Sequence, residues 1–313
     1  MFVARPPARP PLRRDLHLVR AVRRTFTGPA EFLADPANRA RVGEYLADLA
    51  RPYALEVPPD RFGGPPAPAL GHSYGEMAEA LIDPAGEPAD LLILAFSSHD
   101  LRPGRQTAAY LSHVTPGAPM AFAICDQGSA AAFSGLRIAR AYASSAGIRR
   151  ALLIVVEQAD LPYGCPVPLP SQHRGVAMLF GDGPSGEGRS GDGPSDDGTG
   201  PQARLAGLRQ RAGVPPGAVA GLAAADLKEL AASHHQTGLV LSAALAAEWT
   251  APAPAAARVR VMPPGQPSTA VWWGLIDELT GDAGHPDLLV AGDYDPALRY
   301  LCLTAFDTGS RSG

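Results

Sequence analysis

The sequence predicts an α/β protein in which helices cover a mostly parallel sheet. At 313 residues and 46% hydrophobic, the chain is long and apolar enough to bury a sizeable core. Short apolar runs, typical of strands buried on both faces, occur at residues 89–98, 119–125 and 150–160. Helical spacing separates them at 104–114 and 129–147. Alternation of strand and helix along the chain favours this layered class.

The same alternation continues toward the C-terminus. A strand at 176–183 runs into a Gly/Ser/Asp/Pro-rich tract, whose composition cannot bury enough apolar surface to fold. We therefore divide the chain into an N-terminal half (1–183), a flexible linker (184–201) and a C-terminal half (202–313). The C-terminal half is predicted to contain helices at 223–235, 238–249 and 268–282 and strands at 257–262, 287–293 and 298–306. Before residue 89, helical spacing occurs at 37–50 and 73–83, and no strand can be assigned.

Composition excludes several classes of function. The chain has 27 Lys and Arg against 31 Asp and Glu, a net charge of −4, so it lacks the basic field that nucleic-acid binding needs. No run of about 18 apolar residues predicts a membrane span, and the N-terminus lacks the apolar core of a signal peptide. Three widely spaced cysteines fit a reducing compartment. We expect a soluble cytoplasmic protein that binds neither nucleic acid nor membrane.

Cys125 occupies the junction between a predicted strand and a predicted helix in the stretch "AFAICDQGSAAAF". A helix N-terminus favours the thiolate, so Cys125 is a candidate nucleophile, although free cysteines are often buried and inert. The following Asp126 either points away and caps the helix, which we expect, or opposes the thiolate. Cys165 and Cys302 are interpreted as structural, and the tryptophans at 272 and 273 as core or dimer packing.

The stretch "AFAICDQGSAAAFSGLRIARAYASSAGIRRALLIVVEQAD" resembles the active-cysteine segment of the beta-ketoacyl-ACP synthase III family, which has the thiolase fold. Cys125 and Glu157 match the landmarks of that segment, in which a strand ends at the nucleophile and the next strand ends in Glu. Upstream, Thr107 and Ala108 match the helix that precedes the cysteine, and downstream "FGDG" matches a further element. The resemblance implies five α/β/α/β/α layers built from two pseudo-repeated halves.

The resemblance also implies a catalytic triad. The family's His-Gln motif is matched by His235 and Gln236, whereas the neighbouring His234 lacks a following Gln. An adjacent histidine pair without a third ligand does not indicate zinc, and no metal or cofactor is expected. The family's Asn is replaced by Gln266, and its glycine-rich loop keeps only Gly292. Because donor geometry matters for stabilising an oxyanion, Gln266 puts decarboxylative condensation in doubt but not acyl loading of Cys125.

The implied function is a ketosynthase III-like acyltransferase of specialised metabolism. An acyl group would pass from acyl-CoA or an acyl-carrier protein to Cys125, and then to a small-molecule acceptor, with His235 as base. Carbon–carbon condensation is the close alternative. The alternative in which the protein is not an enzyme is a non-catalytic partner subunit of a ketosynthase-like heterodimer. Family members dimerise through the strand after the nucleophile helix, here 150–158, so a homodimer is expected.

Overall fold

The computed structural model describes residues 15–28, 30–55, 71–83, 86–102, 106–161, 169–183, 202–249, 257–281 and 284–309. The predicted linker (184–201) and Cys165 lie outside these ranges. Within them, no helix combines the length and the apolar character that crossing a bilayer requires.

Ten strands and seven α-helices make up the described part of the chain. The strands are β1 (His17–Phe26), β2 (Leu91–Ala95), β3 (Met120–Ile124), β4 (Ala151–Glu157), β5 (His173–Gly181), β6 (Ala203–Arg211), β7 (Thr237–Leu241), β8 (Ala257–Val261), β9 (Leu288–Asp295) and β10 (Tyr300–Asp307). The α-helices are α1 (Pro36–Ala50), α2 (Tyr74–Glu79), α3 (Thr107–Val114), α4 (Ala131–Ser145), α5 (Pro216–Leu230), α6 (Ala243–Glu248) and α7 (Ala270–Thr280). Short 3-10 helices are η1 (Glu31–Ala34), η2 (Arg51–Tyr53) and η4 (Gly128–Ala130).

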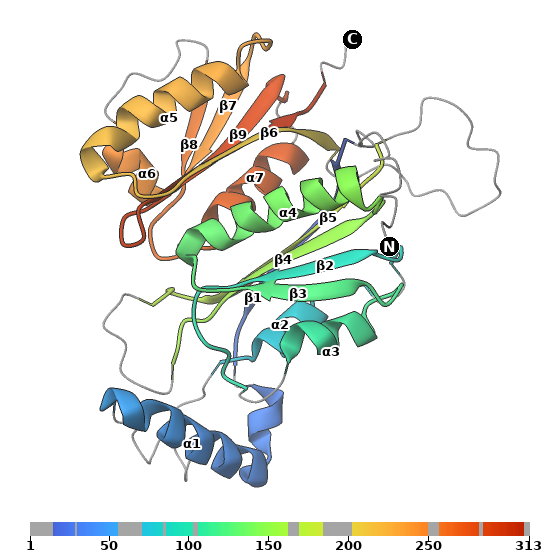
Figure 1. Cartoon of the computed structure of the whole chain (residues 1–313), viewed down its shortest axis with the longest axis vertical. Helices are drawn as coiled ribbons and strands as arrows, with labels where there is room; N and C mark the ends of the chain where they lie inside the picture. Colours follow the sequence, from blue (N-terminus) through green and yellow to red (C-terminus); the bar gives the residue numbers. More distant parts are fainter. Residues whose placement is uncertain are drawn as a thin grey trace, which may run out of the picture.

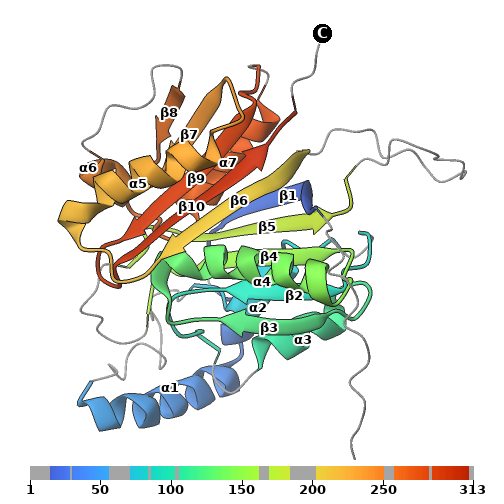
Figure 2. The same ribbon diagram turned by 45° about the horizontal axis from the view of Figure 1, so that its top comes forward.

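The two halves of the chain have the same strand order. From the middle of the sheet outward, the first half runs β1-β5-β4-β2-β3 and the second runs β6-β10-β9-β7-β8. In each half the three outer strands are parallel and the next pair is antiparallel. A short pairing of β1 with β6, at Leu18 and Ala203, joins the two halves, and Figure 2 shows these strands side by side. The predicted pseudo-repeat is therefore present in the topology, although the residues do not repeat.

The two halves fold over each other with two helices between them. Figure 1 shows α4 and α7 between the strands of the two halves, α2 and α3 on one outer face, and α5 and α6 on the other. Phe133 of α4 and Trp272 of α7 are both about 1% exposed, and their ring centroids lie 4.7 Å apart. This order confirms the predicted five-layered α/β/α/β/α architecture and the core position of Trp272.

Strand β2 illustrates why the apolar runs form buried strands. All five of its residues are buried. Leu91 and Ile93 belong to the core around α4 and α7, whereas Leu92 and Leu94 belong to the core under α2 and α3. Successive side chains point to opposite faces of a sheet, so a strand with a core on both faces needs apolar residues throughout.

Three strands were not predicted from the sequence. Segments β1 and β6 are rich in arginine, and in β1 these side chains have acidic partners: Arg20 lies 2.8 Å from Asp83, and Arg23 pairs with Asp277. The helix predicted over 238–249 is wrong in its first half, because residues 237–241 form β7 and the helix begins only at Ala243. A short apolar run does not distinguish a buried strand from a helix by periodicity alone.

The predicted dimer edge is also corrected. Strand β4 pairs with β2 on one side and with β5 on the other, so it has no free edge to extend into a second subunit. The outer edge of the first half is β3, where Met120 is 47% exposed. Cys302 is fully buried in β10, as expected of a structural residue.

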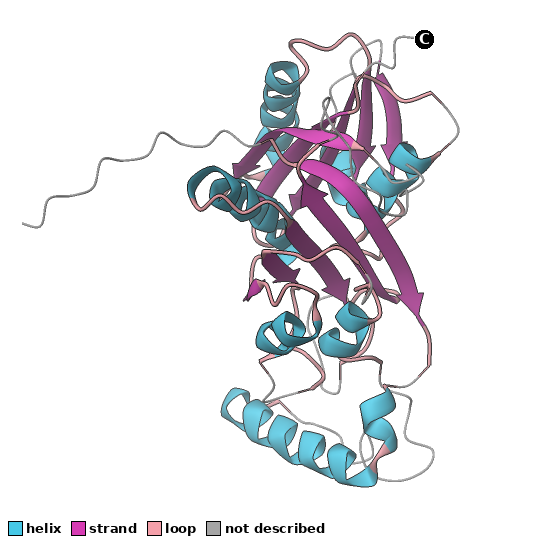
Figure 3. Ribbon diagram, turned by 90° about the vertical axis from the view of Figure 1, so that its right-hand side faces the viewer, coloured by secondary structure: helices cyan, strands magenta, loops and turns pink. Residues whose placement is uncertain are grey.

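Helix α1 forms a small separate layer. Asp35 caps its N-terminus by accepting the Ala37 N–H at 2.9 Å, and a proline occupies its first turn. Its apolar face packs Val42 and Leu46 against η1 and Leu101 in a core of its own. Figure 3 shows α1 beyond α2 and α3, at the far end from the C-terminal half. The site described below therefore lies away from α1.

Candidate active site

The N-terminal ends of the two middle helices each meet a buried carboxylate from the other half. Before α4, the Ser129 hydroxyl donates a hydrogen bond to Asp293 of β9. Before α7, the Ser268 N–H donates to Glu157 of β4 at 2.9 Å. Because β4 and β9 hold the same place in the strand order of their halves, these crossed contacts are reciprocal. We call this region the junction; it consists of Ser129, Glu157, Ser242, Gln266, Ser268, Thr269 and Asp293.

On one side of the junction, Asp293 lies among hydroxyl groups. It is 4% exposed, and Ser129 and Ser242 are 6% and 7% exposed. Burial raises the pKa of Asp293 to about 6, and the hydrogen bonds from Ser129 and Ser242 partly oppose that shift. The neighbouring Asp295 accepts the Ser129 N–H at 3.2 Å. A carboxyl group with this pKa is ionised at neutral pH and remains a usable base.

On the other side, Glu157 receives donors from the start of α7. Its carboxylate accepts the Ser268 N–H at 2.9 Å, the Thr269 N–H at 3.3 Å and the Thr269 hydroxyl. Burial raises the pKa of Glu157 to about 7 despite these donors. The predicted landmark Glu157 is therefore tied to a helix N-terminus, where a carboxylate compensates unpaired N–H groups.

Gln266 also lies in the junction, and its amide is engaged with the protein. The side chain is 5% exposed. Its Nε2 donates to Ser171 Oγ at 3.0 Å and to the Gln172 carbonyl at 3.2 Å, while the Thr269 hydroxyl lies 3.5 Å from its Oε1. An amide nitrogen has two N–H donors, so both are occupied.

Cys125 follows β3 directly and is exposed. Partial desolvation of this exposed thiol and the neighbouring Asp126 both raise its pKa, and the thiol donates to Asp126 Oδ2 at 3.4 Å. Asp126 does not cap a helix as expected: its φ is 60°, and the N-cap of η4 is Gln127, which makes no side-chain capping bond. The geometry agrees with the alternative interpretation, in which the negative charge of Asp126 disfavours a thiolate at Cys125.

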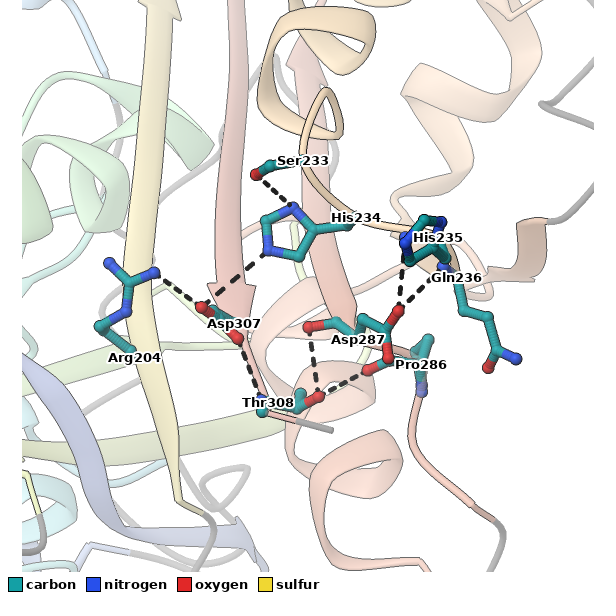
Figure 4. Close-up of polar contacts among 10 residues, drawn as sticks. Arg204, Ser233, His234, His235, Gln236, Pro286, Asp287, Asp307 and Thr308 are labelled. Atoms are coloured by element: carbon teal, nitrogen blue, oxygen red, sulfur yellow. Dashed lines mark hydrogen bonds and ion pairs between the residues drawn. The ribbon is translucent and has the colours of Figure 1, made fainter. Parts of the chain in front are cut away.

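His235 lies in the turn between α5 and β7, not at the start of a helix. Figure 4 shows His234 and His235 beside two aspartates. The N–H groups of His235 and Gln236 lie 3.3 Å from Asp287 Oδ2, and His234 Nε2 lies 4.0 Å from Asp307. These contacts hold the turn against the start of β9 and the end of β10.

The structure does not bring His235 together with Gln266. Strands β7 and β8 are parallel and in register from Thr237 opposite Ala257 to Leu241 opposite Val261. His235 precedes β7, whereas Gln266 follows β8, so the two residues lie at opposite ends of these strands. Five residues of strand span roughly 16 Å. The residue that follows β7 on the junction side is Ser242.

Ser242 was not predicted as a site residue, although the sequence carries a signal for it. Its side chain accepts the Leu245 N–H at 3.1 Å and so caps α6, and a serine ahead of a helical segment is a recognised N-cap pattern. Ser129 carried no comparable signal, because it stands in a run of small residues. Among the described residues, no group of three or more His, Cys, Asp or Glu side chains is placed to hold a metal ion.

Comparison with solved structures identifies the fold. The tetronic acid condensing enzyme AbyA1 is 14% identical, with a TM-score of 0.55 over 93% of this chain and 99% of that one. The acyltransferase ChlB3 is 18% identical, with a TM-score of 0.56 over 94% and 98%. The 3-oxoacyl-(acyl carrier protein) synthase III of Pseudomonas aeruginosa PAO1, FabH, is 14% identical, with a TM-score of 0.52 over 94% and 98%.

No protein-family model and no curated protein matches the chain by sequence. The structural similarity therefore establishes the fold: the chain has the thiolase-type fold of ketosynthase III enzymes, as the sequence resemblance predicted. Since one fold supports many chemistries, activity has to be argued from the junction itself.

Proposed function

We propose that the protein is a ketosynthase III-like acyltransferase. It takes an acyl group from an acyl-CoA or acyl-carrier-protein thioester onto a nucleophile of the segment 125–129 and passes it to a small-molecule acceptor. The observation that supports this most directly is the contact of Ser129 with Asp293, because it joins a nucleophile and a buried carboxylate base from opposite halves. The segment 125–129 also contains Cys125, the nucleophile that the resemblance implies.

The contacts of Gln266 favour acyl transfer over decarboxylative condensation. An extender unit that loses carbon dioxide leaves an enolate oxygen, which needs hydrogen-bond donors. Both N–H groups of Gln266 are taken by Ser171 and Gln172, so this amide has none to spare. An alcohol or amine acceptor needs no such enolate. Carbon–carbon bond formation remains the alternative reaction.

A second candidate function is that of a non-catalytic subunit paired with a ketosynthase-like partner. The raised pKa of Cys125 favours it, because a protonated thiol is a poor nucleophile. The position of His235 favours it too, because His235 lies beside Asp287 at the start of β9 and not at the junction. On this alternative, no residue of the chain should accept an acyl group.

Intact-mass measurement after incubation with acetyl-, butyryl- and octanoyl-CoA tests the proposal. An acyltransferase gains the mass of one acyl group and releases free CoA. The same preparation, given malonyl-CoA, should release little carbon dioxide, whereas rapid release would promote the condensing reaction to first place. Unchanged mass with every donor, including acyl groups presented on a carrier protein, would favour the non-catalytic subunit.

A further inference from the structure

Ser129 has the surroundings of an activated nucleophile. It stands in the 3-10 turn η4 that leads into α4, and its side chain is 6% exposed. Its hydroxyl donates to Asp293 Oδ2, and its backbone N–H donates to Asp295 Oδ2 at 3.2 Å. Two contacts from β9 thus fix both the backbone and the hydroxyl of one serine.

Ser242 fixes the other member of the pair. Its hydroxyl oxygen accepts the Leu245 N–H at 3.1 Å, and its own N–H donates to the Gly292 carbonyl at 2.9 Å. With its oxygen engaged as an acceptor, the hydroxyl of Ser242 has its O–H free to donate to Asp293, with which it is hydrogen-bonded. Asp293 therefore receives hydroxyl donors from both halves of the protein.

We propose that Ser129 is the residue that takes the acyl group, with Asp293 as its base and Ser242 as the positioning residue of Asp293. This inference rests on the proposed acyltransferase function and names the nucleophile within it. A nucleophile, a base in contact with it and a third group that orients the base form the arrangement that general-base-assisted nucleophilic catalysis requires.

The reaction balances with groups already present. Ser129 Oγ attacks the thioester carbonyl while its proton passes to Asp293. The C–S bond then breaks, and the departing thiolate takes that proton and leaves as CoA-SH or carrier-SH. The acyl group is now an oxygen ester on Ser129. An alcohol or amine attacks this ester, loses its proton to Asp293, and the Ser129 oxygen leaves and recovers it.

The charges around Asp293 suit this role at neutral pH. Burial raises its pKa to about 6, with a further contribution from the nearby carboxylate of Asp295. Cys302 faces the same region from β10, and burial raises its pKa well above its ordinary value, so it stays neutral. Asp293 is thus ionised at pH 7 and becomes protonated as the pH falls through about 6.

The turn between β9 and β10 packs beside Gly128, the residue before Ser129. The turn at residues 296–299 joins β9 to β10 and carries Leu298, which is 45% exposed. At Gly128, beside the serine, an added Cβ would come within 1.9 Å of Asp295 Oδ2 and 3.1 Å of Leu298 Cδ1. The glycine therefore allows the end of β9 and this turn to pack closely against the segment that carries Ser129.

Two probes test the inference on the full-length protein. The first is a fluorophosphonate, which labels activated serines whatever acyl group the enzyme prefers. The second is the acyl-CoA panel, with the modified peptide mapped by mass spectrometry. Neutral hydroxylamine separates the adducts, since it cleaves a thioester on cysteine and leaves an oxygen ester on serine.

Wild type and Cys125→Ser should react with both probes at Ser129, and Ser129→Ala should react with neither. Asp293→Asn keeps the shape of the side chain but cannot act as a base, so labelling should slow by about 10²-fold or more. Ser242→Ala should retain labelling but move its acid limb to higher pH, because Asp293 loses a donor that lowers its pKa. Ser145→Ala, which changes an exposed serine of α4, is the matched control.

Each outcome decides a different claim. Acylation on Cys125 that survives Ser129→Ala would overturn the inference and leave the acyltransferase intact. Fluorophosphonate labelling of Ser129 without any acylation would keep the activated serine and reject the acyltransferase. Absence of both reactions in a wild-type protein that unfolds cooperatively would reject both. Ser129→Cys provides a further check, since a thiol at that position should become acylated with a hydroxylamine-sensitive bond.

Discussion

Replacing Glu157 by glutamine should remove a pH-dependent part of the stability. The carboxylate is buried at the N-terminus of α7 and accepts the Ser268 N–H at 2.9 Å and the Thr269 N–H at 3.3 Å. Burial raises its pKa to about 7, whereas the unfolded chain has the ordinary glutamate value. Between these two values the folded protein holds a proton that the unfolded chain has released.

The direction and the size of this pH dependence follow from the linkage between proton binding and folding. Where the folded state binds more protons, the free energy of unfolding falls as the pH rises. The contribution of Glu157 is therefore fully present below about pH 4.5 and is lost as the pH rises through about 7. A difference of roughly 2.5 pKa units corresponds to about 3–4 kcal/mol, since one unit is worth about 1.4 kcal/mol. Glutamine does not titrate, so the variant lacks this slope.

Urea unfolding at several pH values between 5 and 8 measures the effect. The quantity to follow is the free energy of unfolding of wild type minus that of Glu157→Gln, in which the titration of Asp293 and other shared groups cancels. It should fall by about 2–3 kcal/mol across this range, because part of the total effect is already lost below pH 5. Glu44→Gln, on the exposed face of α1, should show no such trend. A difference that stays constant with pH would refute the raised pKa and the reasoning built on it.

Three further substitutions probe packing and charge. Gly128→Ala should destabilise the protein by about 2 kcal/mol in urea unfolding, because φ is +53° and the new Cβ would collide with Asp295. Arg211→Met should cost about 3 kcal/mol and more than Asp226→Asn, because it strands a carboxylate that is 1% exposed; equal losses would contradict this. Phe133→Ala should lower the free energy of unfolding by about 3–5 kcal/mol, and a loss below 1 kcal/mol would show that the core between the sheets repacks.

The first half of the fold was largely predictable because its central strands are buried on both faces. The apolar runs at 89–98 and 150–160 contain β2 and β4, all of whose residues are buried. The run at 119–125 contains β3, which was predicted correctly as a strand but wrongly as one buried on both faces, because it lies at the edge of the sheet and only Ile124 is buried. Strand β1 was not predictable in this way. Its arginines are compatible with a central strand only because acidic groups such as Asp277 come from distant segments, and such partners are not visible in a local pattern.

The predicted site was only partly assembled, and one misread strand explains most of the difference. Treating 238–249 as a helix placed His235 at a helix start, which is where the resemblance requires a histidine. Because 237–241 instead form β7, His235 falls before the strand, and Ser242 takes the position after it. Gln266 was placed correctly beyond β8, since the strand and helix around it were read with the right boundaries.

The reciprocal contacts of Glu157 and Asp293 show how a repeated fold can divide its work between equivalent positions. Each carboxylate comes from a corresponding strand and crosses to the start of the opposite middle helix. Glu157 accepts two backbone N–H groups at the start of α7, as a helix cap does, together with the Thr269 hydroxyl of the same turn, so changing it acts first on stability. Asp293 is bound by the hydroxyls of Ser129 and Ser242, which can give up and recover a proton where backbone amides cannot. The same topology thus supplies a structural carboxylate in one half and, by the chemistry of its donors, a candidate base in the other.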